Sequence, residues 1–248
     1  MTDTLLVIPA RYGSTRFPGK VLEKLDGKPL LEWVYLACLK SGLGETLIAT
    51  ESETVVKAAA AFGASAILTS ASCPSGTDRV YAASRGRTED YIINVQSDEP
   101  FIEPETLRAV LFKLKSDPKA DIATACAPFS DTDDISDTNC VKAAVSENGR
   151  AIYFSRSPVP YHHPLSEIGK TPWLKHCGIY GYKKAALEKF VSLPPSQLER
   201  LERLEQLRAL EAGMVIACAV IKRLGPAVDS PPDMARAREY LRELGGAK

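Results

Sequence analysis

The sequence predicts an α/β fold built on a mostly parallel sheet, with a small β-hairpin subdomain. In the first half of the chain, short apolar runs alternate with segments of helical periodicity. This alternation is typical of a parallel sheet with helices on both faces. In the second half, two strand-like runs flank Ser146-Glu147-Asn148-Gly149, and Asn-Gly is a strong hairpin signal. We therefore expect a single domain over residues 1–248, with the hairpin subdomain near residues 130–180.

The elements of the first half follow one another closely. Strands are expected at residues 5–9, 46–50, 66–68 and 91–95. Helices are expected from Pro29 through Cys38, at 51–62 closed by Gly63, from about Thr77, and at 104–115. Proline suits the first turn of a helix and glycine its end.

The second half adds further strands around the hairpin. The hairpin strands are expected at 141–145 and 151–154, a long loop at 155–174, and later strands at 176–182 and 215–220. Leucines recur at every third position from Leu198 to Leu210, which we interpret as one charged helix, and a closing helix is expected at 231–244.

The composition restricts the class of protein. Of the 248 residues, 45% are hydrophobic and 25% charged, which is ordinary for a globular chain and excludes a disordered one. Lys plus Arg and Asp plus Glu both number 31, which argues against a general nucleic-acid binder or a polybasic membrane protein and still allows a local basic site.

The lack of an apolar span or a signal-peptide pattern, together with the spacing of the cysteines, leads us to expect a soluble, cytoplasmic protein. No apolar run approaches the ~20 residues of a membrane span, and the N-terminus lacks the pattern of a signal peptide. The six cysteines form no CxxC pair. We expect reduced thiols, without a disulfide framework or a zinc knuckle.

A basic loop follows the first predicted strand. It contains Arg11, Arg16 and Lys20. Ligands of open α/β sheets bind beyond the carboxyl ends of the strands, so the loop is placed to form a site. Cations and glycine-permitted turns suit a polyphosphate. A solvated surface turn with scattered cations is the alternative.

Two familiar phosphate-binding motifs do not fit this loop. Gly13 and Gly19 have five residues between them and Val21 follows Lys20, whereas a Walker A loop needs four residues between its glycines and then Lys-Ser or Lys-Thr. A GxGxxG fingerprint is also absent. A P-loop kinase and an ordinary dehydrogenase are both disfavoured.

An acidic turn follows the fourth predicted strand. Asp98 and Glu99 would lie at the carboxyl edge of the sheet, near the basic loop. Carboxylate oxygens facing a phosphate are the usual protein ligands of Mg²⁺. Asp229 is a second candidate ligand. The alternatives are helix caps, for a helix near Pro104 in the first case and for the closing helix in the second.

Seven segments, in order along the chain, resemble the 3-deoxy-manno-octulosonate cytidylyltransferase (CMP-Kdo synthetase) family. They are residues 8–20, 75–79, 94–100, 153–156, 176–182, 204–208 and 228–231. Each motif is moderately specific by itself, but seven in the same order are highly specific.

The resemblance implies a fold, a reaction and a setting. The fold would be a Rossmann-like mixed, mostly parallel sheet of the nucleotide-diphospho-sugar transferase, glycosyltransferase-A type. The reaction would be CTP plus Kdo giving CMP-Kdo plus pyrophosphate, with Mg²⁺. The protein would be a cytoplasmic homodimer serving lipopolysaccharide biosynthesis, without nucleic-acid or membrane partners.

The resemblance also implies roles for individual residues. Arg11, Arg16 and Lys20 would neutralise the triphosphate, and Asp98 and Asp229 would hold the catalytic Mg²⁺. The cytidine pocket would comprise Ala10, Ser75, Gly76, Arg79 and Gln96, together with Arg11 and Lys20. The sugar acid would contact Arg156, His176, Tyr180, Glu205 and Gln206.

The residue types agree with this chemistry, with a few departures. Arg156 suits the carboxylate of Kdo, and the other sugar-binding residues offer mixed donors and acceptors. The family usually has Gly at Ser97, Thr at Ser230, Glu at Pro232 and Leu at Cys177. The open alternatives are a cytidylyltransferase for the 8-amino analogue of Kdo or another sugar acid, and a catalytically silent nucleotide-binding regulator.

Overall fold

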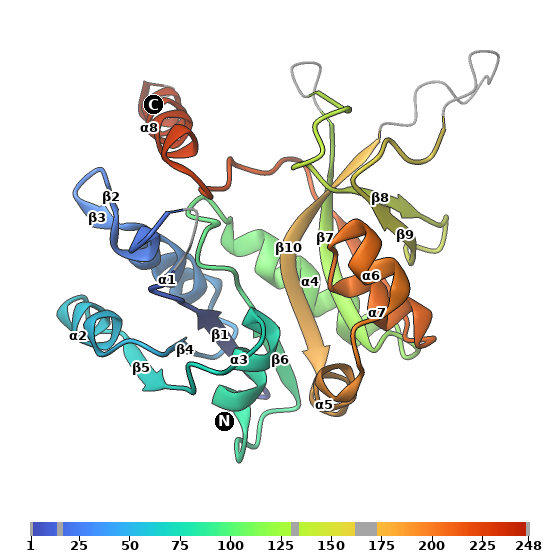
Figure 1. The fold of residues 1–248 in the computed structure, drawn as a ribbon, viewed down its shortest axis with the longest axis horizontal. Coiled ribbons are helices and arrows are strands. Elements are labelled where there is room, and N and C mark those ends of the chain that lie inside the picture. The colour runs from blue at the N-terminus through green and yellow to red at the C-terminus, as the bar shows by residue number, and fades with distance from the viewer. Residues whose placement is uncertain (1, 14–16, 130–133, 162–172, 247–248) are drawn as a thin grey trace. The chain divides into compact units, whose positions relative to one another are not determined.

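The computed structural model describes residues 2–13, 17–129, 134–161 and 173–246 (Figure 1). The chain divides into two compact units: Met1–Arg108 with Leu224–Lys248, called unit 1 here, and Ala109–Arg223, called unit 2. Unit 2 contains the hairpin region expected near 130–180 and extends beyond it at both ends.

Unit 1 is built on parallel strands in the order β6-β1-β4-β5. Their bounds are β1 Thr4–Pro9, β4 Glu45–Thr50, β5 Ser65–Leu68 and β6 Tyr91–Asn94. Every residue of β1 is buried, as expected for a parallel strand covered on both faces. The four strands predicted for this half are confirmed, and their carboxyl ends share one edge of the sheet.

The helices of unit 1 lie where the sequence predicts them. They are α1 Leu30–Ser41, α2 Glu53–Ala61, α3 Gly76–Ser84, the first part of α4 Pro104–Ser116, and α8 Pro231–Gly246. Gly63, just after α2, has φ +79°, a left-handed conformation that glycine adopts without strain. Ser75 caps α3 by accepting a hydrogen bond from the Asp78 amide at 3.2 Å. Among the helices in the described ranges, none is both long and apolar enough to cross a bilayer.

A short hairpin that we did not predict follows the basic loop. The 3₁₀ turn η1 Lys20–Leu22 leads into β2 Lys24–Leu25 and β3 Lys28–Pro29. The turn residues Asp26 and Gly27 have φ +50° and +79°. Asp-Gly is a known hairpin signal, so the sequence did contain the information.

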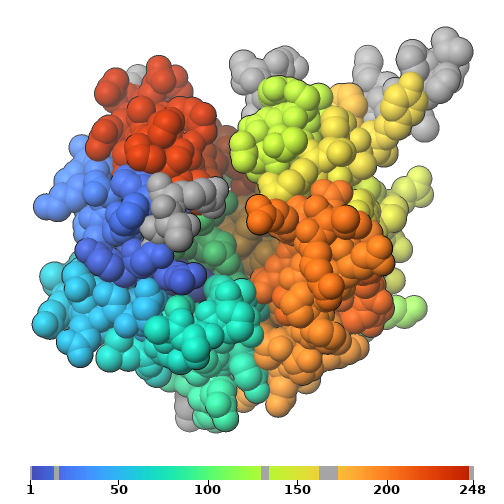
Figure 2. All heavy atoms as spheres, in the orientation of Figure 1, coloured from blue at the N-terminus to red at the C-terminus, as the bar shows by residue number. Residues whose placement is uncertain are grey.

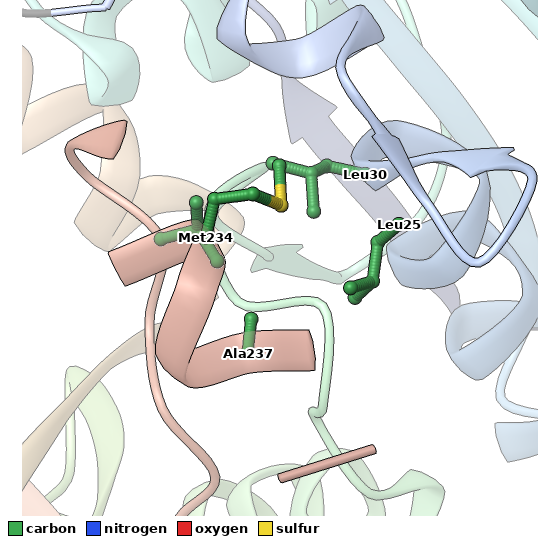
Figure 3. Close-up of a cluster of buried hydrophobic side chains, with 5 residues drawn as sticks. Leu25, Leu30, Met234 and Ala237 are labelled. Atoms are coloured by element: carbon green, nitrogen blue, oxygen red, sulfur yellow. The ribbon is translucent and has the colours of Figure 1, made fainter. Parts of the chain in front are cut away.

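The C-terminal segment of unit 1 returns to this hairpin. Figure 3 shows Met234 and Ala237 of α8 facing Leu25 and Leu30, and Val228 completes this buried cluster. In Figure 2 the side chains of α8, in red, adjoin those of the N-terminal segment, in blue. Removing this apolar surface from water fixes the segment before α8 within unit 1.

Unit 2 is built on a mixed sheet. β7 Ile122–Pro128 runs antiparallel to β10 Leu174–Lys183 and parallel to β11 Ile216–Val220. The predicted hairpin is confirmed as β8 Lys142–Val145 and β9 Ala151–Ser155. Together with the parallel strands of unit 1, this confirms a mixed, mostly parallel α/β fold. The sequence interpretation missed β7, whose alanine-rich run has low strand propensity, and α5 Lys184–Ser192.

The single leucine-rich helix predicted from Leu198 to Leu210 is wrong. The segment forms two short helices, α6 Gln197–Glu202 and α7 Gln206–Glu211, separated at Arg203, which has φ +55°. A spacing of three falls short of the 3.6-residue helical turn, so the leucines could not line one face. Leu201 is 72% exposed whereas Leu207 is fully buried.

Candidate functional site

Three charged residues that are distant in sequence meet in unit 1. Lys20 Nζ lies 2.9 Å from Asp229 Oδ1 and 3.2 Å from Asp98 Oδ2. Lys20 begins η1, Asp98 follows β6 and Asp229 precedes α8. The backbone amide of Val228 donates to the Asp98 carbonyl at 2.9 Å, which holds the two acidic segments side by side. We call these three residues the Lys20 cluster.

The Lys20 cluster is a partly buried charge network. Burial alone would lower the pKa of Lys20, but Asp98 and Asp229 outweigh it and raise that pKa, so the ammonium stays charged. Burial raises the pKa of Asp98, and Lys20 opposes this shift. Burial, with added repulsion from the two aspartates, raises the pKa of Glu99 to about 8. Several carboxyl groups, those of Asp98, Glu99 and Asp229, therefore surround the Lys20 ammonium.

The carboxylates of Asp98 and Asp229 both contact Lys20, a feature that a helix-cap role would not require. At the start of α8 the capping role belongs to Asp233. Its Oδ2 accepts from the amides of Asp229 and Ser230 at 3.0 and 2.8 Å and from the Ser230 hydroxyl at 2.7 Å. Sequence reasoning missed Asp233, although Ser-x-x-Asp is a capping-box spacing.

The acidic pair fits a hard divalent cation. Two carboxylate oxygens already converge on one cationic nitrogen, that of Lys20. Within the described residues no group of three or more His, Cys, Asp or Glu is arranged to hold a metal. Two protein carboxylates suit Mg²⁺, which keeps several waters and shares its remaining positions with phosphate oxygens.

The predicted cytidine residues gather at the carboxyl edge of the unit 1 sheet. Ala10 is fully buried and its amide donates to the Ala49 carbonyl at 2.8 Å. A Cβ on Gly76 would lie 3.6 Å from Pro9 Cγ and 3.7 Å from Gln96 Oε1, so the start of α3 lies against the ends of β1 and β6. Ser75 is adjacent, as the α3 cap.

The remaining cations of the predicted site differ in environment. Arg79 is 3% exposed, pairs with Glu51 at 3.1 Å and donates to the Thr69 hydroxyl at 2.6 Å. Arg11 is exposed after β1. Arg16 lies outside the described residues.

Glu51 is a site residue that sequence reasoning missed. Its Oε1 accepts from the Tyr12 amide at 2.9 Å, while its Oε2 pairs with Arg79. Glu51 thus ties the start of the basic loop to α3. Its position directly after a predicted strand was the available signal, because ligand sites of α/β sheets collect there.

Four of the five predicted sugar-acid residues lie in one region of unit 2. His176 and Tyr180 are on β10, with ring centroids 5.3 Å apart. Glu205 stands at the N-cap position of α7 and the buried Gln206 begins that helix. Burial raises the pKa of Tyr180 well above its usual value, and Tyr182 and Glu205 add to the shift, which places the Glu205 carboxylate near the phenol.

Arg156, the fifth predicted sugar-acid residue, is engaged with backbone carbonyls. Its Nε, Nη1 and Nη2 donate to the carbonyls of Glu202, Thr138 and Arg203 at 2.8, 2.7 and 3.4 Å. The bonds to Glu202 and Arg203 lie at the C-terminal end of α6, and the bond to Thr138 reaches the segment before β8. A guanidinium has five N–H groups, so it retains donors for a carboxylate. Sequence reasoning did not foresee the structural part of this role.

The comparisons with known proteins show the family of the chain. Residues 5–216 match a protein-family model described as cytidylyltransferase. The chain belongs to the cytidylyltransferase family. A protein from Elusimicrobium minutum (strain Pei191) named 3-deoxy-manno-octulosonate cytidylyltransferase is 55% identical over 98% of this chain and 99% of its own. A protein of the same name from Acidobacterium capsulatum is 43% identical over 97% of both chains.

Solved structures extend the agreement to three dimensions. A structure of CMP:2-keto-3-deoxy-manno-octonic acid synthetase complexed with CTP matches with a TM-score of 0.89 and 38% identity, over 97% of this chain and 98% of the other. A cytidylyltransferase from Leptospira borgpetersenii matches with a TM-score of 0.62 and 15% identity, over 99% and 96%. The second match shows the shared fold alone. The Rossmann-like nucleotidyltransferase fold expected from the sequence is confirmed.

Proposed function

We propose that the protein is a 3-deoxy-manno-octulosonate cytidylyltransferase, which converts CTP and Kdo to CMP-Kdo and pyrophosphate. The observation that carries this proposal is the Lys20 cluster, an ammonium held between two carboxylates at the carboxyl edge of a parallel sheet. The high identity to relatives with that name, over nearly the whole chain, supports the choice of substrates.

The proposed reaction is a nucleotidyl transfer without a covalent enzyme intermediate. The anomeric oxygen of Kdo forms a bond to the α-phosphorus of CTP, the bond from that phosphorus to the bridging oxygen of pyrophosphate breaks, and the anomeric proton leaves to solvent. Lys20, Arg11 and Arg16 neutralise the triphosphate, and positioning and charge neutralisation do most of the work.

Asp98 and Asp229 are the proposed ligands of Mg²⁺. When bound, the ion would act as a Lewis acid that lowers the pKa of the attacking hydroxyl and polarises the α-phosphate. The two residues also hold Lys20 charged and in place. Because Asp98 and Asp229 also keep Lys20 charged, their negative charge affects triphosphate binding by Lys20 as well as metal binding.

Recognition of the two substrates is proposed to use different groups. Ala10, Ser75, Gly76, Arg79 and Gln96 would recognise cytidine. Arg156, His176, Tyr180, Glu205 and Gln206 would recognise the sugar acid. The second set combines a cation for the carboxylate with neutral donors and acceptors for hydroxyls.

We also propose the setting that the family resemblance implies. The enzyme would act as a homodimer in the cytoplasm and supply an activated sugar for lipopolysaccharide biosynthesis. Light scattering on the purified protein tests the dimer, and a monomer at working concentration would contradict it.

The activity is tested by pyrophosphate release with CTP and a panel of sugar acids. We expect Kdo to give the highest kcat/KM and Mg²⁺ removal by a chelator to abolish turnover. A preference for the 8-amino analogue or another sugar acid would change the substrate but keep the reaction. Binding of CTP without pyrophosphate release for any acid would favour the silent nucleotide-binding regulator instead.

A further inference from the structure

The β10 strand bulges where it carries the predicted sugar-acid residues. Its pairing with β7 shifts between Cys177 and Tyr180, and Tyr180 is the residue paired with Thr124. Two residues of β10 in this interval, Gly178 and Ile179, have no partner on β7. Bulges near functional sites re-aim side chains and leave backbone groups without ladder partners. The backbone carbonyls that lack a ladder partner at the bulge must accept hydrogen bonds from other groups.

The Thr124 hydroxyl fills the bulge. Its Oγ1 lies 2.7 Å from the Ile179 carbonyl oxygen, 3.1 Å from that of Cys177 and 2.9 Å from His176 Nε2. The Thr124 side chain is fully buried, so no bulk water can replace any of these partners. One hydroxyl therefore serves both the backbone of the bulge and the imidazole.

The three partners decide the direction of each hydrogen bond. A hydroxyl has one proton and two acceptor lone pairs, while a carbonyl oxygen can only accept. The proton of Thr124 is therefore directed to the carbonyls, with the shorter contact to Ile179. Toward His176 the Thr124 oxygen must then accept, so the Nε2 atom of the imidazole carries the hydrogen.

The Nδ1 edge of the imidazole is the part of His176 that can bind a ligand. Burial lowers the pKa of His176 to about 3, so the ring is neutral at physiological pH and Nδ1 has a lone pair. Phe154 and Tyr180 fix the ring plane, with centroids 4.9 and 5.3 Å away. As a whole residue His176 keeps some exposure to solvent, and its side-chain hydrogen bond within the described residues is made by Nε2 rather than by Nδ1.

We propose that Thr124 is a positioning residue that holds His176 in the Nε2–H form, so that Nδ1 accepts a hydrogen bond from a hydroxyl of the sugar acid. The identity of the ligand rests on the proposed function, whereas the tautomer assigned to His176 does not. This tautomer determines which group of the substrate His176 can bind. An acceptor atom attracts a hydroxyl and repels a carboxylate, so the carboxylate of the substrate belongs to a cation such as Arg156.

The first test needs no catalysis. Ring ¹⁵N shifts of the three histidines would be recorded at neutral pH, with His176 assigned by its loss in His176→Asn. We expect the Nε2–H tautomer in the wild type and in Thr124→Ser, and a shift toward a tautomer mixture in Thr124→Val. An Nδ1–H form or an imidazolium in the wild type would overturn the proposal, whatever the substrate.

The second test asks whether Nδ1 is the atom that matters. The amide of His176→Asn reaches the position of Nδ1, whereas that of His176→Gln reaches the position of Nε2. We expect the KM for Kdo to rise about tenfold in His176→Gln, the scale of one lost neutral hydrogen bond, and clearly less in His176→Asn. The KM for CTP should stay unchanged in both. Equal losses, or a greater loss in the Asn variant, would overturn the acceptor role.

The Thr124 variants complete the design. Thr124→Ser keeps the hydroxyl and should retain the wild-type KM for Kdo, while Thr124→Val should raise it. If Thr124→Val does not fold, the Ser variant and the two His176 variants still decide the question. Absence of turnover with every sugar acid in the wild type would refute the proposed function, and the ¹⁵N shifts would still show whether Thr124 sets the tautomer of His176.

Discussion

The Lys20 cluster of unit 1 and the His176 cluster of unit 2 (Thr124, Phe154, His176 and Tyr180) are built on opposite principles. In the first, an ammonium is held within 3.2 Å of two carboxylates and remains charged. In the second, the imidazole is neutral, and its neighbours are a hydroxyl and two aromatic rings. Charge organises one cluster and hydrogen-bond direction the other.

The difference corresponds to the chemistry of the two proposed substrates. A triphosphate carries several negative charges, so it is recognised by cations and by carboxylates that hold a metal or a lysine. Sugar hydroxyls are neutral and similar to one another, so they are distinguished by which atom donates and which accepts. We therefore expect substitutions in the Lys20 cluster to act mainly on turnover, and substitutions in the His176 cluster mainly on the KM for the sugar.

The largest effect is expected for Asp98→Asn. The change keeps the shape but removes a charge that serves both Lys20 and the proposed Mg²⁺. We expect kcat to fall by at least ~10²-fold, the scale for losing an electrostatic contact in the transition state, with a smaller change in CTP affinity. Pyrophosphate release at saturating substrates measures this. The exposed Asp90→Asn is the matched control, and near-normal turnover of Asp98→Asn in excess Mg²⁺ would contradict the metal assignment.

Lys20→Ala should give the next largest effect. The ammonium is proposed to meet the charge that develops on the departing pyrophosphate, so we expect kcat to fall by about 10²-fold and CTP affinity to fall less. Steady-state kinetics and direct CTP binding separate the two quantities. If only the KM for CTP rises, Lys20 contributes to binding alone and the contrast between the clusters is weaker than stated.

Arg156→Ala sharpens the comparison, because Arg156 is a charged group in unit 2. Loss of a charge-assisted hydrogen bond to the Kdo carboxylate should raise the KM for Kdo roughly 10- to 100-fold and leave CTP affinity nearly unchanged. We also expect a lower Tm for Arg156→Ala, because three backbone carbonyls lose a hydrogen-bond donor. The exposed Arg85→Ala serves as control. A lower Tm with an unchanged KM would make Arg156 purely structural.

The neutral state of His176 predicts how stability depends on pH. Its pKa is about 3 in the folded protein and about 6.5 in an unfolded chain. Below pH 6.5 the unfolded chain binds a proton that the folded one refuses, so this contribution to stability is present above pH 6.5 and is lost as the pH falls. From pH 6 to pH 5 the unfolding constant should rise roughly tenfold more in the wild type than in His176→Asn. Denaturant titrations at the two pH values measure the unfolding constants. An equal change in the wild type and in His176→Asn would mean that the imidazole is protonated in the folded protein as well.

The sequence predicted the two clusters unequally well. Lys20, Asp98 and Asp229 follow strands or precede a helix, and the rule that parallel strands end at one edge was enough to bring the first two together. Asp229 required the return of α8 to the β2–β3 hairpin, which depends on tertiary packing of Met234 and Ala237. That packing has no local signature in the sequence.

The His176 cluster shows what local pattern cannot supply. Thr124 lies in an alanine-rich strand that carries no strong strand signal, and the bulge in β10 depends on the pairing with that strand. Similarly, the break between α6 and α7 lies at Arg203, the left-handed C-cap residue of α6. The leucine spacing obscured that break. Motif order predicted the sugar-acid residues, but their hydrogen-bond directions required the fold.

The smallest effect is expected for Ser97→Gly, the substitution that restores the residue usual in the family. Gly is required where φ is positive or where a ligand approaches the backbone closely. Ser97 is not among the described non-glycine residues with positive φ, and it is 8% exposed. Its backbone therefore needs no glycine, and its side chain is mostly enclosed beside Asp98. We expect kcat/KM for Kdo and for its 8-amino analogue to move together, by less than about tenfold or ~1.4 kcal/mol. Parallel assays of both substrates measure the ratio. A change in that ratio greater than tenfold would make Ser97 part of the sugar selection, and the acidic turn of unit 1 would then share with the His176 cluster the task of choosing the sugar.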